Sequence, residues 1–293
     1  MKIAVKIIFL LSIIVASLFY GCEEEGPYIN LTPEVVDTSL FDTTYISSTS
    51  VTPDLKKILI EDFTGARCPN CPNAAQKLHE IDSAYPGRII GMAIHPTGLG
   101  FTYPHDTSKD YRTNDGTLIF QMLNGAGTLP IGAIDRKILP PETTILVSYD
   151  KWKSLVDQRV SDNSPINLKL ESTPHKLEPN TFVVRVEAQY TEAVTGKNYI
   201  TIALQEGNLV SPQSLPNGTT DTFYTNNHVL RDVLTNPTGN FLMDNPEMNR
   251  VFIKEFKVKM DNKWNPDNCH FVAFIHNSGA SFDVLQVEEI ELK

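Results

Sequence analysis

Two patterns of hydrophobic and polar positions divide the chain near residue 164. Between residues 54 and 163, short apolar runs alternate with segments whose apolar residues recur at helical spacing. From residue 164 onward, hydrophobic and polar residues alternate with a period of two, which is typical of half-buried β-strands. The sequence therefore predicts an α/β half over residues 54–163, followed by an all-β half over residues 164–293.

The first half is predicted to contain three strands and three helices in alternation. Buried strands are expected over residues 56–63, 89–94 and 128–136. Helical spacing of apolar residues predicts helices after the first strand and over residues 116–124 and 148–160. Because Pro69 suits the first helical position, the first of these helices is expected to begin close to Cys68.

The second half is predicted to contain about six strands. In residues 181–190, Val184, Val186 and Ala188 alternate with polar side chains, and similar alternation recurs over residues 166–170, 199–204, 256–260, 270–277 and 282–292. This pattern predicts an all-β sandwich. Cys269 begins one of these strands and is expected to be a buried, small apolar residue rather than a reactive thiol.

The N-terminus carries features of an exported lipoprotein. Lys2 and Lys6 precede an apolar run over residues 7–18, which is too short to span a bilayer comfortably and fits the core of a signal peptide. The run ends at Gly21-Cys22, which resembles a bacterial lipobox. Residues 1–21 are therefore predicted to be a signal peptide and Cys22 to be lipidated. The alternative is an ordinary secretory signal with an incidental cysteine.

An acidic tether is predicted after the lipidated cysteine. Glu23, Glu24 and Glu25 resemble the surface-export signal of Bacteroidota-type lipoproteins, although a solvated charge run is the alternative. Residues 22–53 are rich in Ser, Thr, Asp and Glu and have no sustained period, which predicts a flexible tether. In the other interpretation, part of this segment adds an edge strand to the next domain.

Composition narrows the function classes. The chain has 293 residues and a formal charge of −10, without clustered Lys and Arg, so nucleic acid is not an expected partner. No segment after residue 18 approaches the ~18 apolar residues of a membrane-spanning helix. The acyl chains on Cys22 are therefore the only membrane attachment that the sequence implies.

The segment TGARCPNC places Cys68 and Cys71 in a C-x-x-C motif. Three interpretations are open, namely a redox pair, half of a zinc site and a structural disulfide. Zinc would need two further ligands. The histidines are scattered along the chain, at His79, His95, His105, His175, His228, His270 and His276. There is no second C-x-x-C, and no metal or cofactor is predicted.

A redox role would draw on the helix that follows the motif. The backbone N–H groups at a helix start stabilise a thiolate, and a cation beside it lowers the thiol pKa further. Cys68 is therefore expected to be the exposed, attacking cysteine and Cys71 the resolving one, with Arg67 activating Cys68. A structural disulfide remains the alternative, since many exported domains keep such a bond without turnover.

These residues resemble a thioredoxin-like domain. The resemblance implies that Asp62, six residues before Cys68, is a buried carboxylate that accepts a proton from the resolving cysteine. It also implies that Thr128-Leu129-Pro130 is the cis-proline segment that contacts the backbone of a protein substrate. Two features depart from that family: Arg67 replaces the frequent aromatic residue, and residues 96–115 form an inserted loop.

The whole mature chain resembles the 28-kDa outer-membrane protein family of Bacteroidota. The markers are EDFTGARCPNC, the segment DTFYTNNHVLRDVLTNPTGN with Tyr224, His228 and Arg231, and the C-terminal VAFIHNSGASFDVLQVEEIEL. The resemblance implies a lipoprotein anchored in the outer membrane, with a thioredoxin-like half and a β-sandwich half. For Tyr224, His228 and Arg231, either a binding role or a packed loop is expected.

Two functions remain open from the sequence. One is a thiol–disulfide oxidoreductase that uses Cys68, Cys71, Asp62 and Pro130 on a protein thiol or disulfide substrate. The other is a surface binding or adhesion module, in which the disulfide is structural and the β-sandwich meets a protein or glycan. Fold alone does not decide between these functions.

Overall fold

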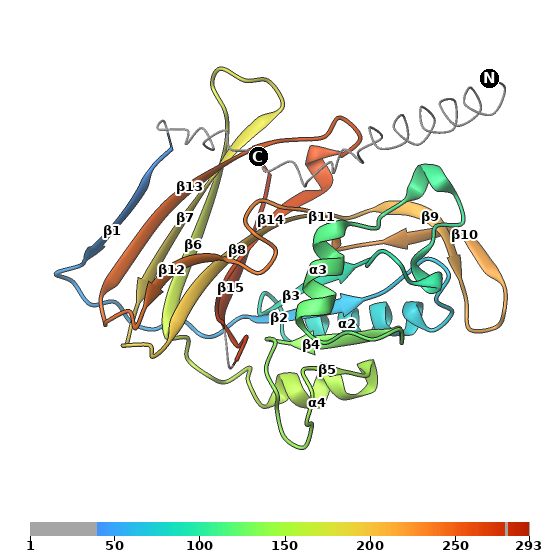
Figure 1. Cartoon of the computed structure of the whole chain (residues 1–293), viewed down its shortest axis with the longest axis horizontal. Coiled ribbons are helices and arrows are strands. Elements are labelled where there is room, and N and C mark those ends of the chain that lie inside the picture. The colour runs from blue at the N-terminus through green and yellow to red at the C-terminus, as the bar shows by residue number, and fades with distance from the viewer. Residues whose placement is uncertain (1–39, 279–280, 293) are drawn as a thin grey trace, which may run out of the picture. The chain divides into compact units, whose positions relative to one another are not determined.

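The computed structural model describes residues 40–278 and 281–292 (Figure 1). The predicted signal peptide, Cys22 and Glu23–Glu25 lie outside the described residues. The described helices are α2 (Cys71–Ala84), α3 (Asn114–Met122) and α4 (Trp152–Asp157). No helix of this described part combines the length and the apolar character that a membrane crossing requires.

Nine of the described strands form one large sheet. They are β2 (Ile58–Phe63), β3 (Ile89–Ile94), β4 (Ile131–Ile134), β5 (Leu146–Val147), β8 (Lys197–Glu206), β11 (Val229–Val233), β12 (Asn240–Asp244), β14 (Cys269–Asn277) and β15 (Val284–Glu291). The order is β15-β14-β8-β11-β3-β2-β4-β5, and β12 also pairs with β8. Strands from both sides of residue 164 therefore belong to the same sheet.

A second sheet has four strands in the order β1-β13-β7-β6. They are β1 (Asp42–Ile46), β6 (Ile166–Pro174), β7 (Thr181–Tyr190) and β13 (Arg250–Lys259). Side chains at alternate positions of β6 and β7 pack against β8 and β14 of the large sheet and form one buried core. The protein is thus mostly β, with two sheets face to face in its second half.

The segment predicted as a tether is partly a strand. Residues 42–46 form β1, which pairs antiparallel with β13 and places Asp42 opposite Lys254. The Lys254 ammonium lies 2.6 Å from the Asp42 carboxylate. These residues therefore form an edge strand, as the alternative to a tether expected, but it joins the sheet of the second half rather than the domain that follows it in sequence.

Helices cover both faces of the large sheet. In Figure 1, α3 lies in front of this sheet and α2 behind it. Leu59 and Phe63 of β2 belong to the core that contains Ile119 and Phe120 of α3. Ile58 and Ile60 belong to the opposite core, which is formed with residues of α2 and α4. Because side chains alternate along a strand, Asp62 lies on the α2 face.

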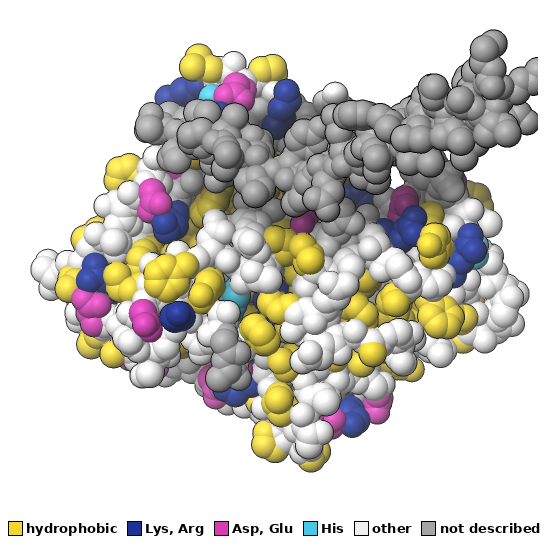
Figure 2. Space-filling model, in the orientation of Figure 1, with side chains coloured by type: hydrophobic (Ala, Val, Ile, Leu, Met, Phe, Trp, Pro, Cys, Tyr) yellow, Lys and Arg dark blue, Asp and Glu magenta, His cyan; other side chains and the backbone are white. Residues whose placement is uncertain are grey.

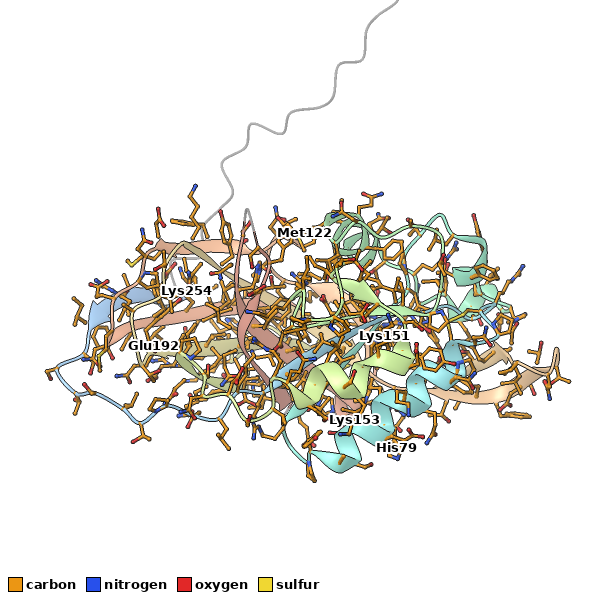
Figure 3. All side chains as sticks on the ribbon, turned by 90° about the horizontal axis from the view of Figure 1, so that it is seen from below. His79, Met122, Lys151, Lys153, Glu192 and Lys254 are labelled. Atoms are coloured by element: carbon orange, nitrogen blue, oxygen red, sulfur yellow. A yellow bond between two sulfur atoms is a disulfide. The ribbon has the colours of Figure 1, made fainter. Side chains whose placement is uncertain are left out.

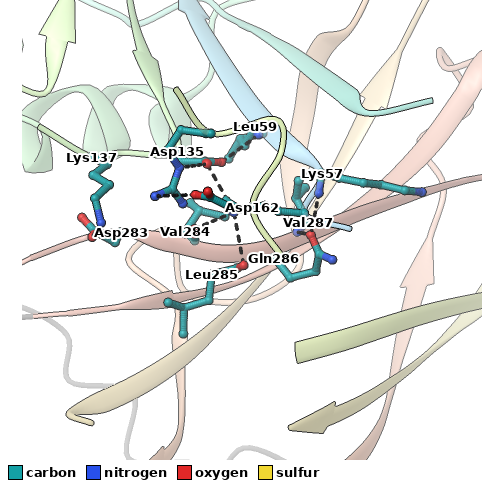
Figure 4. A network of polar contacts seen from close by, with 12 residues as sticks. Lys57, Leu59, Asp135, Lys137, Asp162, Asp283, Val284, Leu285, Gln286 and Val287 are labelled. Atoms are coloured by element: carbon teal, nitrogen blue, oxygen red, sulfur yellow. Dashed lines mark hydrogen bonds and ion pairs between the residues drawn. The ribbon is translucent and has the colours of Figure 1, made fainter. Parts of the chain in front are cut away.

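A buried ion pair connects β2 and β4 to β15 (Figure 4). The Lys56 ammonium lies 3.2 Å from the Asp135 carboxylate, and both side chains are almost fully buried. The same ammonium donates hydrogen bonds to the carbonyls of Val284 (2.9 Å) and Leu285 (3.2 Å). These contacts cross the predicted domain boundary at residues 163 and 164, which itself stays a prediction.

Several segments differ from the sequence expectations in local detail. The segment 220–233, for which no strand was predicted, contains β10 (Thr220–Asn226) and β11. β10 pairs with β9 (Leu209–Ser214) in a separate two-stranded hairpin. Cys269 is 1% exposed and is a free thiol, as predicted. Burial raises the pKa of this thiol to about 12, so it is protonated and unreactive at neutral pH.

Candidate functional site

A disulfide joins Cys68 to Cys71. Cys68 lies just before α2, and Cys71 is the first residue of this helix. Their Cα atoms lie 5.4 Å apart. The predicted start of this helix was wrong by about one turn, because α2 begins at Cys71 rather than close to Cys68. Pro72 occupies the first turn, where a missing N–H costs no helical hydrogen bond. The first cysteine is therefore in a turn and the second is helical.

Both cysteines are buried, each with only 2% of its surface exposed. The prediction that Cys68 is the exposed cysteine was therefore wrong. The reason is the β9–β10 hairpin, residues 209–226, which we call the cover hairpin. From β9, the Gln213 side-chain amide donates to the carbonyls of Cys68 (3.0 Å) and Gly65 (3.2 Å). The N–H of Ser214 donates to the carbonyl of Ala66 (2.9 Å).

The inserted loop holds the turn before the disulfide from another side. The N–H of Arg67 donates to the carbonyl of Phe101 (2.9 Å), and the Arg67 guanidinium donates to the carbonyl of Pro104 (3.0 Å). Gly65 packs so closely on the Phe101 backbone that a β-carbon at this position would collide with it. Arg67 is thus exposed and engaged with the loop.

A cleft of about 570 Å³ opens beside the disulfide. It lies between α2 and the segment 224–228, with β3 as its floor, and we call it the α2 cleft. Cys71 lines the cleft, whereas Cys68 does not. The lining also includes Asp62, Ala75, Gln76, His79, Asp82, Gly91, Ala93, His95, Gln213, Tyr224, Asn226, Asn227, His228 and Glu289.

Asp62 is a buried carboxyl group in this cleft. Only 2% of its surface is exposed, and its Oδ1 atom has no hydrogen-bond partner among the described residues. Burial raises the pKa of Asp62 to about 8, because a charged carboxylate loses its hydration there. The group is therefore mostly protonated at neutral pH and can donate a proton inside the cleft.

His95 is a second buried polar group that lines the cleft. It is 3% exposed, and its Nδ1 atom has no hydrogen-bond partner in the described part of the chain. Burial, together with the nearby Arg231 cation, lowers the pKa of His95 to about 4. Its ring packs edge-on against Tyr111, with 5.7 Å between centroids. His95 is therefore a neutral imidazole.

Imidazole and carboxyl side chains lie around the outer part of the cleft. His79 and Asp82 are exposed residues of α2, and Figure 3 shows His79 on the solvent-facing side of this helix. His228 adopts the left-handed backbone conformation (φ 58°), and its carbonyl accepts a 2.7 Å hydrogen bond from the N–H of Ala93. Across from them, burial raises the pKa of the Glu289 carboxyl.

The structure brings together only part of the predicted site. Asp62, Cys71, Tyr224 and His228 line the α2 cleft, whereas Cys68, Arg67, Pro130 and Arg231 do not.

Arg231 and Pro130 lie elsewhere around the site. The Arg231 guanidinium pairs with Glu206 (3.3 Å) and lies over the rings of Tyr111 and Trp264. This geometry fits a packed structural side chain. The Leu129–Pro130 peptide bond is cis, and the next residue, Ile131, pairs with Phe63 at the end of β2. Pro130 therefore sits at the sheet end from which the chain runs on to the disulfide.

Two important residues escaped the sequence analysis. Gln213 lies in a strand with no hydrophobic alternation, and nothing local in the sequence marks its contact with Cys68. The sequence placed His95 only among the scattered histidines, and its position directly after β3 was the available signal. Its place in the lining of the cleft, together with Asp62, depends on tertiary packing.

Other surfaces of the described residues are less distinctive. No group of three or more His, Cys, Asp or Glu side chains within residues 40–278 and 281–292 is arranged to hold a metal ion. On the face drawn in Figure 2, hydrophobic side chains lie among polar and charged ones. Phe223 of the cover hairpin is 81% exposed, on the outer side of the hairpin.

Solved structures and curated sequences were compared with this chain. The structure resembles HBP35 of Porphyromonas gingivalis with a TM-score of 0.64 at 17% identity, covering 81% of this chain and 76% of that chain. A domain of the outer membrane lipoprotein Omp28 from Porphyromonas gingivalis matches with a TM-score of 0.31 at 16% identity, over 44% of this chain and 89% of that chain. No curated protein sequence matches this chain.

The family model described as outer membrane protein Omp28 matches residues 120–293. This match covers more than half of the chain, and it includes the cover hairpin, the segment 224–228 and β15. The predicted family and the predicted outer-membrane location are confirmed. The chain belongs to the Omp28 family of outer membrane lipoproteins.

Proposed function

We propose that this protein is a thiol–disulfide oxidoreductase of the outer membrane, with the Cys68–Cys71 disulfide as its redox centre. The observation that carries the proposal is the shared cleft of Cys71 and the protonated, unpartnered carboxyl group of Asp62. A disulfide that is only structural has no need for a proton donor beside it. A disulfide that is reduced and reformed must take up and release protons at its sulfurs.

The proposal includes a thioredoxin-like arrangement of the first half. The parallel pair β2–β3, the antiparallel pair β2–β4 and the helix α2 after the disulfide support it. The cis bond before Pro130 supports it as well. In this arrangement the start of α2 stabilises the thiolate form of the pair, because its free N–H groups and positive dipole end face the sulfurs.

A second candidate function rests on the burial of the cysteines. Each is 2% exposed beneath the cover hairpin, which suits a structural disulfide in a surface binding module. In that account, the β-sandwich half binds a protein or glycan, and the cysteine pair stabilises the turn before α2. The two functions differ in whether the disulfide can exchange with external thiols at a useful rate.

Turnover of a disulfide substrate tests the proposed function. The purified chain, with a low-molecular-weight thiol as reductant, is expected to accelerate the reduction of a fluorogenic glutathione mixed disulfide. The Cys68→Ser and Cys71→Ser variants should lose this activity, whereas Cys269→Ser should keep it, since that thiol is buried and protonated. Equal rates with and without the wild-type protein would favour the binding module.

A further inference from the structure

We propose that the α2 cleft admits a low-molecular-weight, zwitterionic thiol to the Cys71 side of the disulfide, so that small thiols rather than protein thiols are the substrates of this site. This inference rests on the proposed oxidoreductase function and names its substrate class. It differs from the sequence-based expectation in two respects: the attacked sulfur is that of Cys71, and the substrate is not a protein.

The cover hairpin closes the Cys68 side to large molecules. Gln213 donates to the carbonyls on both sides of the turn, and the N–H of Ser214 is bonded to Ala66. The Ser214 hydroxyl also lies 3.0 Å from Nε2 of His105 in the inserted loop. A protein substrate that docks beside Pro130 and Cys68 would have to displace this hairpin first.

The cleft leaves the other side of the disulfide open to a small molecule. Its volume of about 570 Å³ falls in the range of roughly 300–1,000 Å³ that small-molecule sites occupy. Gly91 lines the floor, and the Leu78 side chain packs directly against its backbone. Cys71 and Asp62 both line this cleft, so a small molecule that enters it meets the disulfide beside the carboxyl group.

The lining matches a ligand with one ammonium and one carboxylate group. Asp82 and Glu289 offer carboxylates, and His79 and His228 offer imidazoles around the outer part of the cleft. The side chains of Gln76, Tyr224 and Asn226 add neutral hydrogen-bonding groups to the lining. Oδ1 of Asp62 and Nδ1 of His95, which have no hydrogen-bond partner among the described residues, can bond to a ligand in the cleft. A small aminothiol such as cysteine presents complementary groups.

The reaction balances with two equivalents of such a thiol. The first thiolate attacks Sγ of Cys71, the disulfide breaks, and Cys68 leaves as a thiolate that takes up a proton. A second thiolate then attacks the small-molecule sulfur of the mixed disulfide. Cys71 leaves as a thiolate and takes the proton of the Asp62 carboxyl group. The Asp62 carboxylate then takes up a new proton from solvent. The small thiol is oxidised to its disulfide, and the protein disulfide is reduced by two electrons.

The test compares a small thiol with a protein dithiol on the oxidised full-length protein. L-Cysteine and reduced thioredoxin are the two probes, and acid quenching followed by alkylation traps the mixed disulfide. Tandem mass spectrometry of the peptide 68–77 then assigns the adduct to one cysteine. The expected result is a cysteine adduct on Cys71 and faster reduction by L-cysteine than by thioredoxin at equal thiol concentration.

A blocking variant adds an independent readout. Ala75→Trp fills the cleft from α2, and Asn73→Trp places the same side chain on an exposed position of the helix outside the cleft. Ala75→Trp should slow reduction by L-cysteine by about tenfold or more, because the sulfur atoms can no longer approach in line. Asn73→Trp should leave the rate unchanged. Asn227→Trp, on the opposite wall, replaces Ala75→Trp if that variant does not fold.

The outcomes separate the two proposals. An adduct on Cys68, or reduction by thioredoxin that is faster and insensitive to Ala75→Trp, would overturn the small-thiol inference and leave the oxidoreductase function standing. No reduction by either probe under native conditions would overturn both.

Discussion

The N–H of Ala93 donates a 2.7 Å hydrogen bond to the carbonyl of His228. Ala93 lies in β3, and His228 directly precedes β11, so this bond joins the strands of the first half to those of the second. It also fixes the segment 224–228 as the wall of the α2 cleft opposite α2. The contact that completes the large sheet therefore also builds the side of the site that faces Cys71.

The buried Lys56–Asp135 pair is predicted to be essential for stability. Lys56→Met leaves the Asp135 carboxylate buried with one cation fewer, and it removes the bonds to Val284 and Leu285. Because Arg159 still pairs with the Asp135 carboxylate at 3.0 Å, we expect a loss of about 3 kcal/mol in the free energy of unfolding, the lower end of the range for a broken buried pair. The neighbouring Lys57→Met removes a partly exposed pair with Glu288 and should cost about 1 kcal/mol or less.

Urea unfolding monitored by tryptophan fluorescence measures both lysine variants. If both variants lose a similar free energy of unfolding, the buried pair contributes no more to stability than the partly exposed one, which would contradict the prediction.

The raised pKa of Asp62 predicts a pH-dependent stability. Since the folded-state pKa is about 8 and an ordinary aspartate titrates near 3.9, the folded protein holds a proton that the unfolded chain loses between these pH values. The free energy of unfolding therefore falls as pH rises from about 4 to 8. Asp62→Asn cannot ionise and should lose this dependence, whereas exposed Asp82→Asn should keep it.

Thermal unfolding at several pH values tests the Asp62 prediction. At pH 9, Asp62→Asn is expected to unfold about 10–20 °C above the wild type, because each unit of pKa shift contributes about 1.4 kcal/mol. Parallel curves for wild type and Asp62→Asn from pH 4 to 9 would show that Asp62 is not protonated in the folded protein.

The cover hairpin is predicted to limit access to Cys68. Gln213→Ala removes the donor to the carbonyls of Gly65 and Cys68, and each net hydrogen bond contributes about 1 kcal/mol. Opening of the hairpin should then become roughly 5–30 times more frequent. Alkylation of the reduced protein by a bulky maleimide should accelerate at Cys68 by a similar factor. Gln158→Ala removes a comparable donor to the carbonyl of Pro140 and should have no effect on labelling.

Membrane attachment is predicted to depend on Cys22. A Cys22→Ser precursor lacks the thiol that is expected to carry the acyl chains, so the protein should be released or remain unprocessed. Fractionation of the outer membrane checks this, with Cys269→Ser as the control that keeps its anchor. Retention of Cys22→Ser in the outer membrane at wild-type levels would exclude lipidation of Cys22 as the anchor.

Local periodicity was sufficient to predict much of the fold. The strand expected over residues 89–94 is β3, and the alternation over residues 181–190 corresponds to β7. These segments are recognisable because each buries one or both faces in a core, which requires regular apolar positions. The start of α2 was misplaced because Pro69 and Pro72 both suit a first turn, and the sequence alone does not rank them.

The remaining features depend on contacts between distant residues. β9 and β10 have polar inner faces held by hydrogen bonds, so hydrophobic alternation does not mark them. The pairing of Val229 with Ala93 extends the sheet across residue 164, although each half has its own pattern. Asp62 was predicted from a family resemblance, whereas the α2 cleft around it requires the position of the segment 224–228.

The reduction potential of the Cys68–Cys71 pair tests the central claim most directly. It is measured by equilibrating the purified protein in thiol–disulfide buffers of defined potential and counting alkylated cysteines by mass spectrometry. A redox centre stabilised by the start of α2 and by the Asp62 proton is expected between about −270 and −120 mV, the range of catalytic pairs. A potential below about −300 mV, typical of structural disulfides, would contradict the oxidoreductase function.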